Sequence, residues 1–546
     1  MRRPDLSSWF DNLCLLVRDI PKSRRLGGGL HSGTGAESLG QLQKEIETFL
    51  NSLRHPVLVE DELKLLDLTA GQWSVTLEPR GLVLQAWGPG QSIFRRIEQF
   101  AYRDLGRLGV IVLKPGGREP ATLEFRELDA PTQPCAERTV RHAHFRRQSL
   151  AILQDQFTGW RFERVSNHSD REHSFSAWYT RGLMRQGRNG WAFLALAEAE
   201  ALAAGDSALA YGLIWLDWLR GQFERDPVVG LKLFLPEQAL ASTCHRAAYL
   251  NSRAAQIEVW ELNSASLSAV DLSDFGNVET RLAPRSAADE AARRLGEQHE
   301  NWLRKLLAEA FNYVQLVPEP ASKGFSIRMN GLEVARVHEP AIGRAPRVYF
   351  GTEGNHRLLD DSNQDEFRLL VTSVAAVRQA RTSDPSHEFY RFQSERWLES
   401  LVVQDVTRID PSLSPDHIYP QVPAFAGADR GVIDVLGVTR EGRLAVIELK
   451  LQEEINLLMQ GLDYWLRVKW LNDHSQFGEF GYFPGVDIAE SAPLLYIVCP
   501  AFRFHSTFGR MVRYLDPGVK VIQVGLNDGW REAVRVLFRR RLNDGS

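Results

Sequence analysis

Asp434, Glu448 and Lys450 are the residues of this chain whose types and spacing best suit chemistry. They lie on two apolar runs, 432–438 and 444–447, and the pattern predicts a β-hairpin. Two carboxylates that face each other repel unless a cation lies between them, and Mg²⁺ is usually held by one or two carboxylates and a substrate phosphate. The hairpin therefore predicts a divalent-cation site with an ammonium group beside it. The alternative is a pair of strand ends that carry ordinary surface charges.

The turn of this hairpin sets which residues face each other. If Thr439 pairs with Arg443, the loop is Arg440-Glu441-Gly442, with glycine where a positive φ is needed. The register then places Asp434 opposite Glu448, where Cβ atoms are about 5 Å apart. Glu448 and Lys450 are two residues apart, so they share one face of the strand.

Two helices are expected to flank the hairpin. Residues 452–470 carry an apolar stripe at helical spacing, with Gln460 and Tyr464 four residues apart on one face. Residues 394–405 predict a second helix, with Glu395 and Glu399 also four apart. The alternatives are a solvated Gln beside a half-buried Tyr, and a solvent-facing pair of Glu side chains. The sequence does not choose between Glu395 and Glu399.

Together, Asp434, Glu448-Leu449-Lys450 and Gln460-x-x-x-Tyr464 resemble the PD-(D/E)XK nuclease superfamily, closest to NucS/EndoMS-type endonuclease domains, with a RecB-like Gln-x-x-x-Tyr element. The resemblance covers about residues 385–540, and Ile433 stands where the motif has proline. It implies a restriction-endonuclease-like mixed α/β sheet flanked by helices. It also implies that Asp434 and Glu448 bind Mg²⁺ or Mn²⁺, that Lys450 assists the attacking water, and that Glu399 or Glu395 lies near the metal.

The function that follows is a Mg²⁺-dependent endonuclease that hydrolyses DNA phosphodiester bonds in repair or defence, with RNA not excluded as a substrate. Two alternatives stay open. One is a nucleic-acid-binding module of nuclease fold with little catalysis, and the other is a non-enzymatic scaffold protein. The sequence does not distinguish a mismatch, a flap, a free end or a modified site as the substrate.

The composition limits which broad classes of protein the chain can belong to. The chain has 546 residues, 44% of them hydrophobic and 25% charged, with a net charge of −4, which is typical of a globular protein of several domains. Four cysteines lie far apart, without metal-ligand spacing, and Cys499 ends an apolar run as a core thiol would. We expect a cytoplasmic protein without a membrane-spanning segment.

The chain also resembles itself. Residues 191–198, 211–220 and 231–236 parallel 444–451, 460–468 and 495–500, and Pro236 to Asn263 has the same spacing as Pro500 to Asn527, 27 positions. We predict a tandem duplication; the alternative is two unrelated α/β segments with generic patterns. The predicted parts are an N-terminal segment with a Gly/Ser-rich linker (1–39), a helix with a small β-rich domain (40–135), a degenerate nuclease-like α/β domain (136–270), a helix with a small β/α accessory domain (271–383) and the PD-(D/E)XK nuclease domain (384–541).

In the first copy, Ala195-Leu196-Ala197 stand where Glu448-Leu449-Lys450 stand in the second, and Arg181 falls near the position of Asp434. One catalytic centre per chain is expected, so that cutting both strands would need two chains, as in a homodimer. Arginines of the first copy could bind phosphate, or could form a solvated, salt-bridged face. The candidate nucleic-acid contacts are Arg146, Arg147, Arg181, Arg185, Arg188 and Arg430.

The remaining elements of the second copy are read from its apolar runs. Strands are expected at 494–499 and 519–526, with a helix around 506–515 between them. Residues 530–541 predict a closing basic amphipathic helix.

Overall fold

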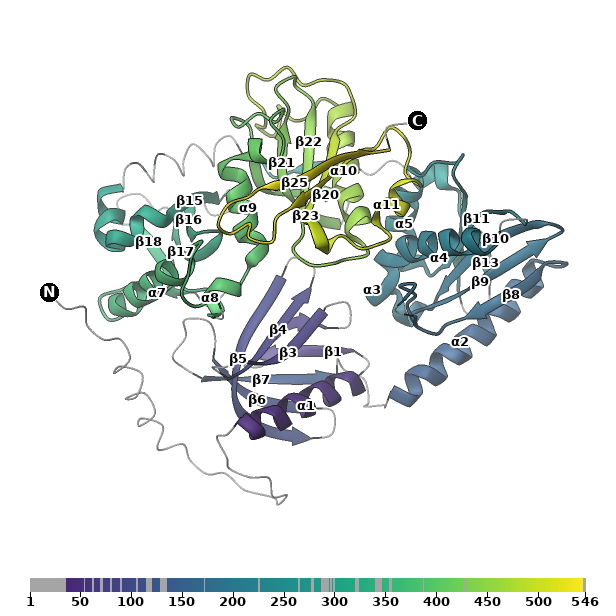
Figure 1. Cartoon of the computed structure of the whole chain (residues 1–546), viewed down its shortest axis with the longest axis horizontal. Coiled ribbons are helices and arrows are strands. Elements are labelled where there is room, and N and C mark those ends of the chain that lie inside the picture. The colour runs from purple at the N-terminus through teal and green to yellow at the C-terminus, as the bar shows by residue number, and fades with distance from the viewer. Residues whose placement is uncertain are drawn as a thin grey trace.

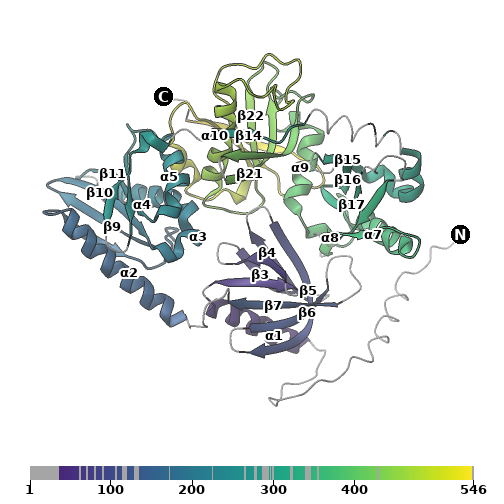
Figure 2. The same cartoon turned by 180° about the vertical axis from the view of Figure 1, so that it is seen from behind.

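The protein is a mixed α/β chain with several sheets, as the computed structural model shows (Figures 1 and 2). The structure describes residues 36–543, apart from 54, 61–62, 69–71, 79–80, 89–90, 105–106, 114–119, 128–134, 171, 224–225, 264–265, 276–278, several positions in 286–299, 320–323, 339–345, 353–355, 386 and 427–428. Of the predicted N-terminal segment with its Gly/Ser-rich linker (1–39), residues 1–35 lie outside these residues, and 36–39 belong to helix α1 (Ala36–Ser52) instead. Within them, no helix combines the length and the apolar character needed to cross a membrane.

The first domain is an antiparallel sheet covered by one helix. Its strands follow the order β2-β1-β7-β6-β5-β4-β3, and helix α1 packs against β3 and β4. Leu42, Ile46 and Phe49 of the helix enter the same apolar core as the strands. The elements are α1 (Ala36–Ser52), β1 (Pro56–Glu60), β2 (Leu63–Asp67), β3 (Gln72–Glu78), β4 (Gly81–Gly88), β5 (Gln91–Asp104), β6 (Arg107–Leu113) and β7 (Pro120–Glu127).

The first α/β half (residues 135–269) is a six-stranded sheet in the order β13-β12-β11-β10-β9-β8. Helices α4 and α5 cover one face, and the long helix α2 lies along the other (Figure 1). Its main elements are α2 (Cys135–Gln156), β8 (Arg161–Ser166), β9 (Tyr179–Gln186), β10 (Asn189–Leu196), α3 (Ala201–Ala204), α4 (Ala208–Gln222), β11 (Val228–Leu235), α5 (Leu240–Ala247), β12 (Gln256–Leu262) and β13 (Leu267–Ala269).

The second accessory domain has a five-stranded antiparallel sheet in the order β15-β16-β17-β18-β19. Helix α7 packs on it with Phe367, Leu370 and Val374 in a shared core. The elements are β15 (Val314–Glu319), β16 (Gly324–Met329), β17 (Leu332–His338), β18 (Arg347–Phe350), β19 (Arg357–Leu358) and α7 (Gln364–Val377).

The second α/β half (residues 388–542) has the sheet order β14-β20-β21-β22-β23-β24-β25. Strand β14 (Thr280–Leu282) comes from the segment predicted to be accessory and pairs with β20 at the sheet edge. The other elements are α8 (Glu388–Arg391), α9 (Ser394–Gln404), β20 (Tyr419–Ala426), β21 (Asp429–Val438), β22 (Leu444–Leu449), α10 (Leu457–Asp473), β23 (Leu494–Pro500), α11 (Phe508–Val512), β24 (Lys520–Leu526) and β25 (Val536–Leu542).

The predicted closing helix at 530–541 is wrong, because Val536–Leu542 is the edge strand β25, antiparallel to β24. The reason is tertiary. The phenyl ring of Phe538 lies over Gly525 of β24, where an added Cβ would be only 2.3 Å from the ring. A two-residue alternation therefore fits the edge of the sheet better than a helical stripe would. The core position predicted for Cys499 is confirmed, since this free thiol is fully buried in β23.

The two α/β halves share strand order and strand direction. In each, two antiparallel pairings are followed by two parallel pairings and a final antiparallel one, from β8 to β13 and from β20 to β25. Gly212 and Gly461 occupy the same place in α4 and α10, and an added Cβ would lie 2.8 Å from Leu231 and 2.7 Å from Ile497. Helix-to-sheet packing is therefore equally close in both halves.

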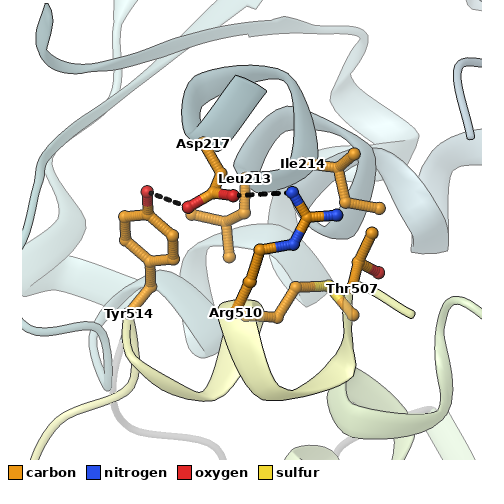
Figure 3. A pocket seen from close by; sticks show the side chains of 7 residues that line it. Leu213, Ile214, Asp217, Thr507, Arg510 and Tyr514 are labelled. Atoms are coloured by element: carbon orange, nitrogen blue, oxygen red, sulfur yellow. Dashed lines mark hydrogen bonds and ion pairs between the residues drawn. The ribbon is translucent and has the colours of Figure 1, made fainter. Parts of the chain in front are cut away.

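The halves pack face to face through α4 and α5 of the first and α10 and α11 of the second (Figures 1 and 2). Contacts come in crossed pairs, α4 with α11 and α5 with α10. Between α4 and α11, Asp217 accepts from Arg510 at 3.1 Å and from Tyr514 at 3.2 Å, beside a shallow hollow (Figure 3). Between α5 and α10, Arg246 binds both oxygens of Asp463 at 2.7 and 2.5 Å. Such reciprocal contacts are the pattern of a two-fold dimer interface, here within one chain.

Candidate active site

The predicted turn of the hairpin is confirmed, and so is its register from the turn back to Val435. The Thr439 N–H donates to the Arg443 carbonyl at 2.7 Å, and Gly442 takes a φ of +83° in the turn. The ladder then runs back from Val438↔Leu444 to Val435↔Ile447, so Asp434 and Glu448 are the next residues to face each other. The hairpin thus brings the two carboxylates to one place on the sheet.

Both carboxylates lie where charge is poorly solvated. Burial raises the pKa of Asp434 to about 6, partly opposed by the Leu449 N–H, which donates to Asp434 Oδ2 at 3.0 Å. Burial, and then the charge of Asp434, raise the pKa of Glu448 well above its ordinary value. Glu448 is only 2% exposed, and its Oε2 atom has no hydrogen-bond partner among the described residues. A buried acceptor without a partner is costly, so this atom calls for a cation.

Helix α9 brings both candidate glutamates to the site, where they contact different residues. Glu399 is buried, and Arg396 donates to its Oε2 at 3.0 Å. Burial raises the pKa of Glu399 to about 8. Glu395 accepts from the Leu451 N–H at 3.2 Å and lies 3.9 Å from the Lys450 Nζ. Glu399 therefore belongs to the Asp434 side of the site and Glu395 to the Lys450 side.

Gln421 of β20 is a site residue that the sequence analysis missed. Its side-chain amide donates to Glu399 Oε2 at 2.5 Å and to Asp434 Oδ1 at 3.3 Å, and so joins α9 to the hairpin. Its backbone has a φ of +51°, which is strained for a residue with a Cβ. The flanking Pro420 and Pro423 hide the strand from any periodic pattern, so the sequence held no signal for this residue.

The accessory domain fixes the start of α9. The buried Arg378 donates to the carbonyls of Phe389 and Phe392 at 2.6 Å and of Gln393 at 3.1 Å, just before the helix. Gly331, in the β16–β17 turn, meets the Arg396 carbonyl so closely that a Cβ would be 2.1 Å from it. The position of Glu395 and Glu399 therefore depends on a neighbouring domain.

Lys450 follows directly after β22. Its Nζ lies 3.1 Å from Glu454 and 3.9 Å from Glu395. Burial alone would lower the pKa of Lys450, but the charges of Glu395, Glu454 and Glu448 raise it above its ordinary value. Lys450 is therefore a stable ammonium group that can bind or orient an oxygen, rather than a base that accepts a proton.

Gln460 and Tyr464 share one face of α10 as predicted. The Gln460 amide donates to the Tyr464 hydroxyl at 3.5 Å. Burial, and then the charge of Glu448, raise the pKa of Tyr464 to about 12, so the phenol stays protonated beside that carboxylate. The helix is thus seated over the carboxylate side of the hairpin.

The donor set suits a hard divalent cation at Asp434 and Glu448. Two close carboxylates whose pKa values are raised by burial and repulsion, one of them with a free oxygen, are stabilised by such an ion. Over the described ranges, no group of three or more His, Cys, Asp or Glu is arranged to hold a metal. Magnesium does not require one, because it usually keeps several waters and takes substrate phosphate as a ligand.

In the first half, an arginine and a leucine occupy the positions that match the two carboxylates. The ladders align Arg181–Leu194–Leu233 with Asp434–Glu448–Ile497, and a proline follows three residues later in each half. The position of Glu448 is therefore held by Leu194, which corrects the sequence alignment with Ala195 by one residue. No acid stands there, and Arg181 is buried with its guanidinium 4.6 Å from the Phe175 ring centre.

The arginines predicted to bind phosphate differ in availability. Arg181 donates to the carbonyl of His168 at 2.6 Å, and the buried Arg185 stacks on Phe223 at 4.6 Å, so neither is free to bind a ligand and both predictions are corrected. Arg147 and Arg188 are exposed. Arg146 donates to Asn167 at 3.3 Å. The side chain of Arg430 lies outside the described residues.

Comparisons with known proteins leave the family open. No protein-family model matches the chain, and no curated protein sequence matches it. Among solved structures, the chain is similar to Can2 from Sulfobacillus thermosulfidooxidans, solved in complex with cyclic tetra-adenylate. The identity is 10%, the match covers 53% of this chain and 70% of that chain, and the TM-score is 0.13. A likeness this low carries no argument about fold or function.

Proposed function

We propose that the chain is a metal-dependent nuclease of the PD-(D/E)XK type that hydrolyses phosphodiester bonds of DNA, with one active site per chain. The observation that carries the proposal is the buried Glu448 Oε2 atom, which has no hydrogen-bond partner among the described residues and lies near Asp434 and Lys450. A buried carboxyl group whose pKa is raised by burial and by a neighbouring carboxylate is typical of functional sites. The order of strands β20 to β25 fits the mixed sheet that the sequence resemblance implies.

In the proposed reaction, Asp434 and Glu448 would hold Mg²⁺ or Mn²⁺, and the chemistry that such an ion would supply there is polarisation of the scissile phosphate and a lower pKa for a bound water. Lys450, kept protonated by its acidic neighbours, binds or orients the attacking oxygen and offsets the negative charge of the transition state. Gln421 and the Glu399 carboxyl keep Asp434 in position through their shared hydrogen bonds.

We also propose that the two α/β halves arose by tandem duplication, and that the first lost its chemistry. Support comes from the matched ladders, the paired glycines and the crossed contacts between the halves. One active site per chain then nicks a single strand. Cutting both strands would still require two chains, as in the homodimer that the sequence analysis raised.

The test is nicking of supercoiled plasmid with Mg²⁺ or Mn²⁺, beside a panel of duplex, single-stranded, flap, mismatch and RNA substrates. Wild type should relax the plasmid, while Asp434→Ala, Glu448→Ala and Lys450→Ala should be inactive yet folded. Asp170→Asn, at a half-exposed carboxylate of the first half, is the control and should be active. Equal cleavage by wild type and all three variants would refute the proposal, and binding without cleavage would favour a pure binding module.

A further inference from the structure

Phe502 is the most exposed large hydrophobic side chain in the described part of the chain. It is 83% exposed, in the short 3-10 turn Ala501–Arg503 that follows β23. Its neighbour Phe504 is packed against Phe508 and Phe538 at 5.2 and 6.2 Å between ring centres. Phe502 is thus left exposed on the turn, whereas the next aromatic ring along the chain, Phe504, is already used in packing.

The turn lies at the end of the sheet where the parallel strands β22 and β23 finish, and Lys450 directly follows β22 at the same end. Strands β22 and β23 are parallel, and the Lys450 N–H donates to the Val498 carbonyl at 3.0 Å. The chain reaches the turn two residues after Cys499, next to the end of β22. Just beyond, His505 lies 3.8 Å from Glu453, three residues after Lys450, and 3.1 Å from Ser174 of the first half.

The first half provides an internal comparison. Its matching turn, Glu237–Ala239, is also a 3-10 helix after a proline, Pro236 in place of Pro500. In that turn Gln238 holds the position of Phe502, and the buried Ala239 holds that of Arg503. Of these two turns, only the one in the half that has the carboxylates carries an aromatic ring and a guanidinium group.

The side chain of Arg503 is exposed, and within the described ranges it forms no ion pair, hydrogen bond or ring contact. An exposed aromatic ring next to an unpaired guanidinium group suits single-stranded nucleic acid, because a base stacks on the ring while the guanidinium binds the adjacent phosphate. A base inside a duplex has both faces covered by its neighbours, so the ring cannot stack on it without disrupting the helix.

We propose that Phe502 and Arg503 form a substrate-binding site for an unpaired nucleotide beside the scissile phosphate, so that the substrate is single-stranded or locally unpaired nucleic acid. This inference rests on the proposed function for the place of the scissile phosphate. It adds a substrate class that the carboxylates and Lys450 do not define.

The test is binding of the full chain, in EDTA to prevent cleavage, to a single-stranded oligonucleotide that contains 2-aminopurine and to its duplex. Phe502→Ala should weaken single-strand binding about tenfold and abolish fluorescence quenching by the ring, while Phe502→Trp retains both. Arg503→Ala should reduce the dependence of single-strand affinity on salt by about 0.7 in logarithmic slope. Leu537→Ala, at an exposed apolar residue of β25, is the matched control and should bind as wild type.

The inference is overturned if wild type binds no single strand, if Phe502→Ala binds as wild type, or if it weakens duplex binding equally. Cleavage assays separate this result from the proposed function. Loss of stacking in Phe502→Ala with no cleavage by wild type supports the binding site and refutes hydrolysis. Metal-dependent cleavage by wild type together with unchanged binding by Phe502→Ala supports the active site and refutes the stacking site.

Discussion

Arg246 and Arg510 occupy the same position in the two α/β halves, and each guanidinium group binds a carboxylate of the other half. Arg246 is 4% exposed and makes a bidentate pair with Asp463, whereas Arg510 is 46% exposed and bonds to Asp217. The interface is therefore symmetric in its layout and unequal in its burial. That inequality allows the two arginines to serve as each other's control.

Arg246→Ala should destabilise the protein by about 3 kcal/mol, because it leaves the Asp463 carboxylate without its partner at a packed interface. Arg510→Ala should change the free energy of unfolding by less than about 1 kcal/mol, because solvent screens that pair. Urea unfolding of both variants measures the difference. Equal effects would contradict the unequal burial of the two pairs.

Glu448→Gln should make the metal-free protein more stable by about 1 kcal/mol, although it should abolish cleavage. The substitution replaces a buried carboxyl group that faces Asp434, whose ionisation burial opposes and whose Oε2 atom has no partner among the described residues, by an uncharged amide. Thermal unfolding in EDTA measures this gain. Added Mg²⁺ should raise the Tm of wild type and leave that of Glu448→Gln unchanged, while Glu490→Gln, at an exposed carboxylate of the same half, should behave as wild type.

The stability of the metal-free protein should fall as pH rises from about 5 to 8. Burial raises the pKa of Glu399 to about 8 from 4.5, so the folded state binds this proton more tightly than the unfolded chain does. The stability that results is complete below about pH 4.5 and is lost as pH rises through 8. Burial likewise raises the pKa of Asp434 from 3.8 to about 6, which adds to the lower part of the window.

Glu399→Gln should flatten the upper part of this profile, between about pH 6 and 8, because its amide does not titrate. Thermal unfolding in EDTA across that range makes the comparison. A wild-type Tm that rises over this range, or an unchanged slope in the variant, would show that Glu399 ionises normally.

Gln421→Gly should lower cleavage about tenfold without loss of stability. The substitution removes the amide that bonds to Asp434 and Glu399, while glycine relieves a positive φ that costs about 1 kcal/mol. Arg164→Gly is the matched control, since Arg164 also has a positive φ, +52°, in the matching strand β8. Its activity should equal that of wild type, and a parallel loss in both variants would argue against a role for Gln421 in positioning Asp434.

Gly331→Ala should reduce both stability and cleavage, because the new Cβ would lie 2.1 Å from the Arg396 carbonyl and push α9 away from the site. We expect a loss above about 2 kcal/mol. Gly187→Ala also introduces a Cβ at positive φ, +62°, but no other atom of the described residues lies within 4 Å of it, so only backbone strain of about 1 kcal/mol is expected there. Unfolding and nicking assays compare the two variants. Equal stability and full activity in both would contradict the inference that the accessory domain holds α9 in position.

The hairpin could be predicted from the sequence because its signals are local. Two apolar strands, a glycine turn and a fixed register together determine where Asp434 and Glu448 lie. The helix at 394–405 was likewise local, and its bounds nearly match those of α9, Ser394–Gln404. The sequence could not show which of Glu395 and Glu399 approaches the hairpin. In the structure both do, Glu395 through the Leu451 N–H and Glu399 through Gln421.

Other features depended on contacts that the sequence does not display. Residues 536–542 became a strand because β24 offers an unpaired edge, which outweighs the helical pattern of arginines. Leu194 rather than Ala195 matches Glu448, because the apolar run of β10 contains no polar residue to mark which side faces the helices. Gln421 became a site residue only through a bend in β20 between two prolines.

The crossed contacts between the halves should form independently of protein concentration. An interface between separate chains obeys mass action and dissociates on dilution, whereas the faces of α4, α5, α10 and α11 are joined by one backbone. Their association therefore has no bimolecular step. The support that the first half gives to α10, which carries Gln460 and Tyr464, persists at any number of molecules per cell.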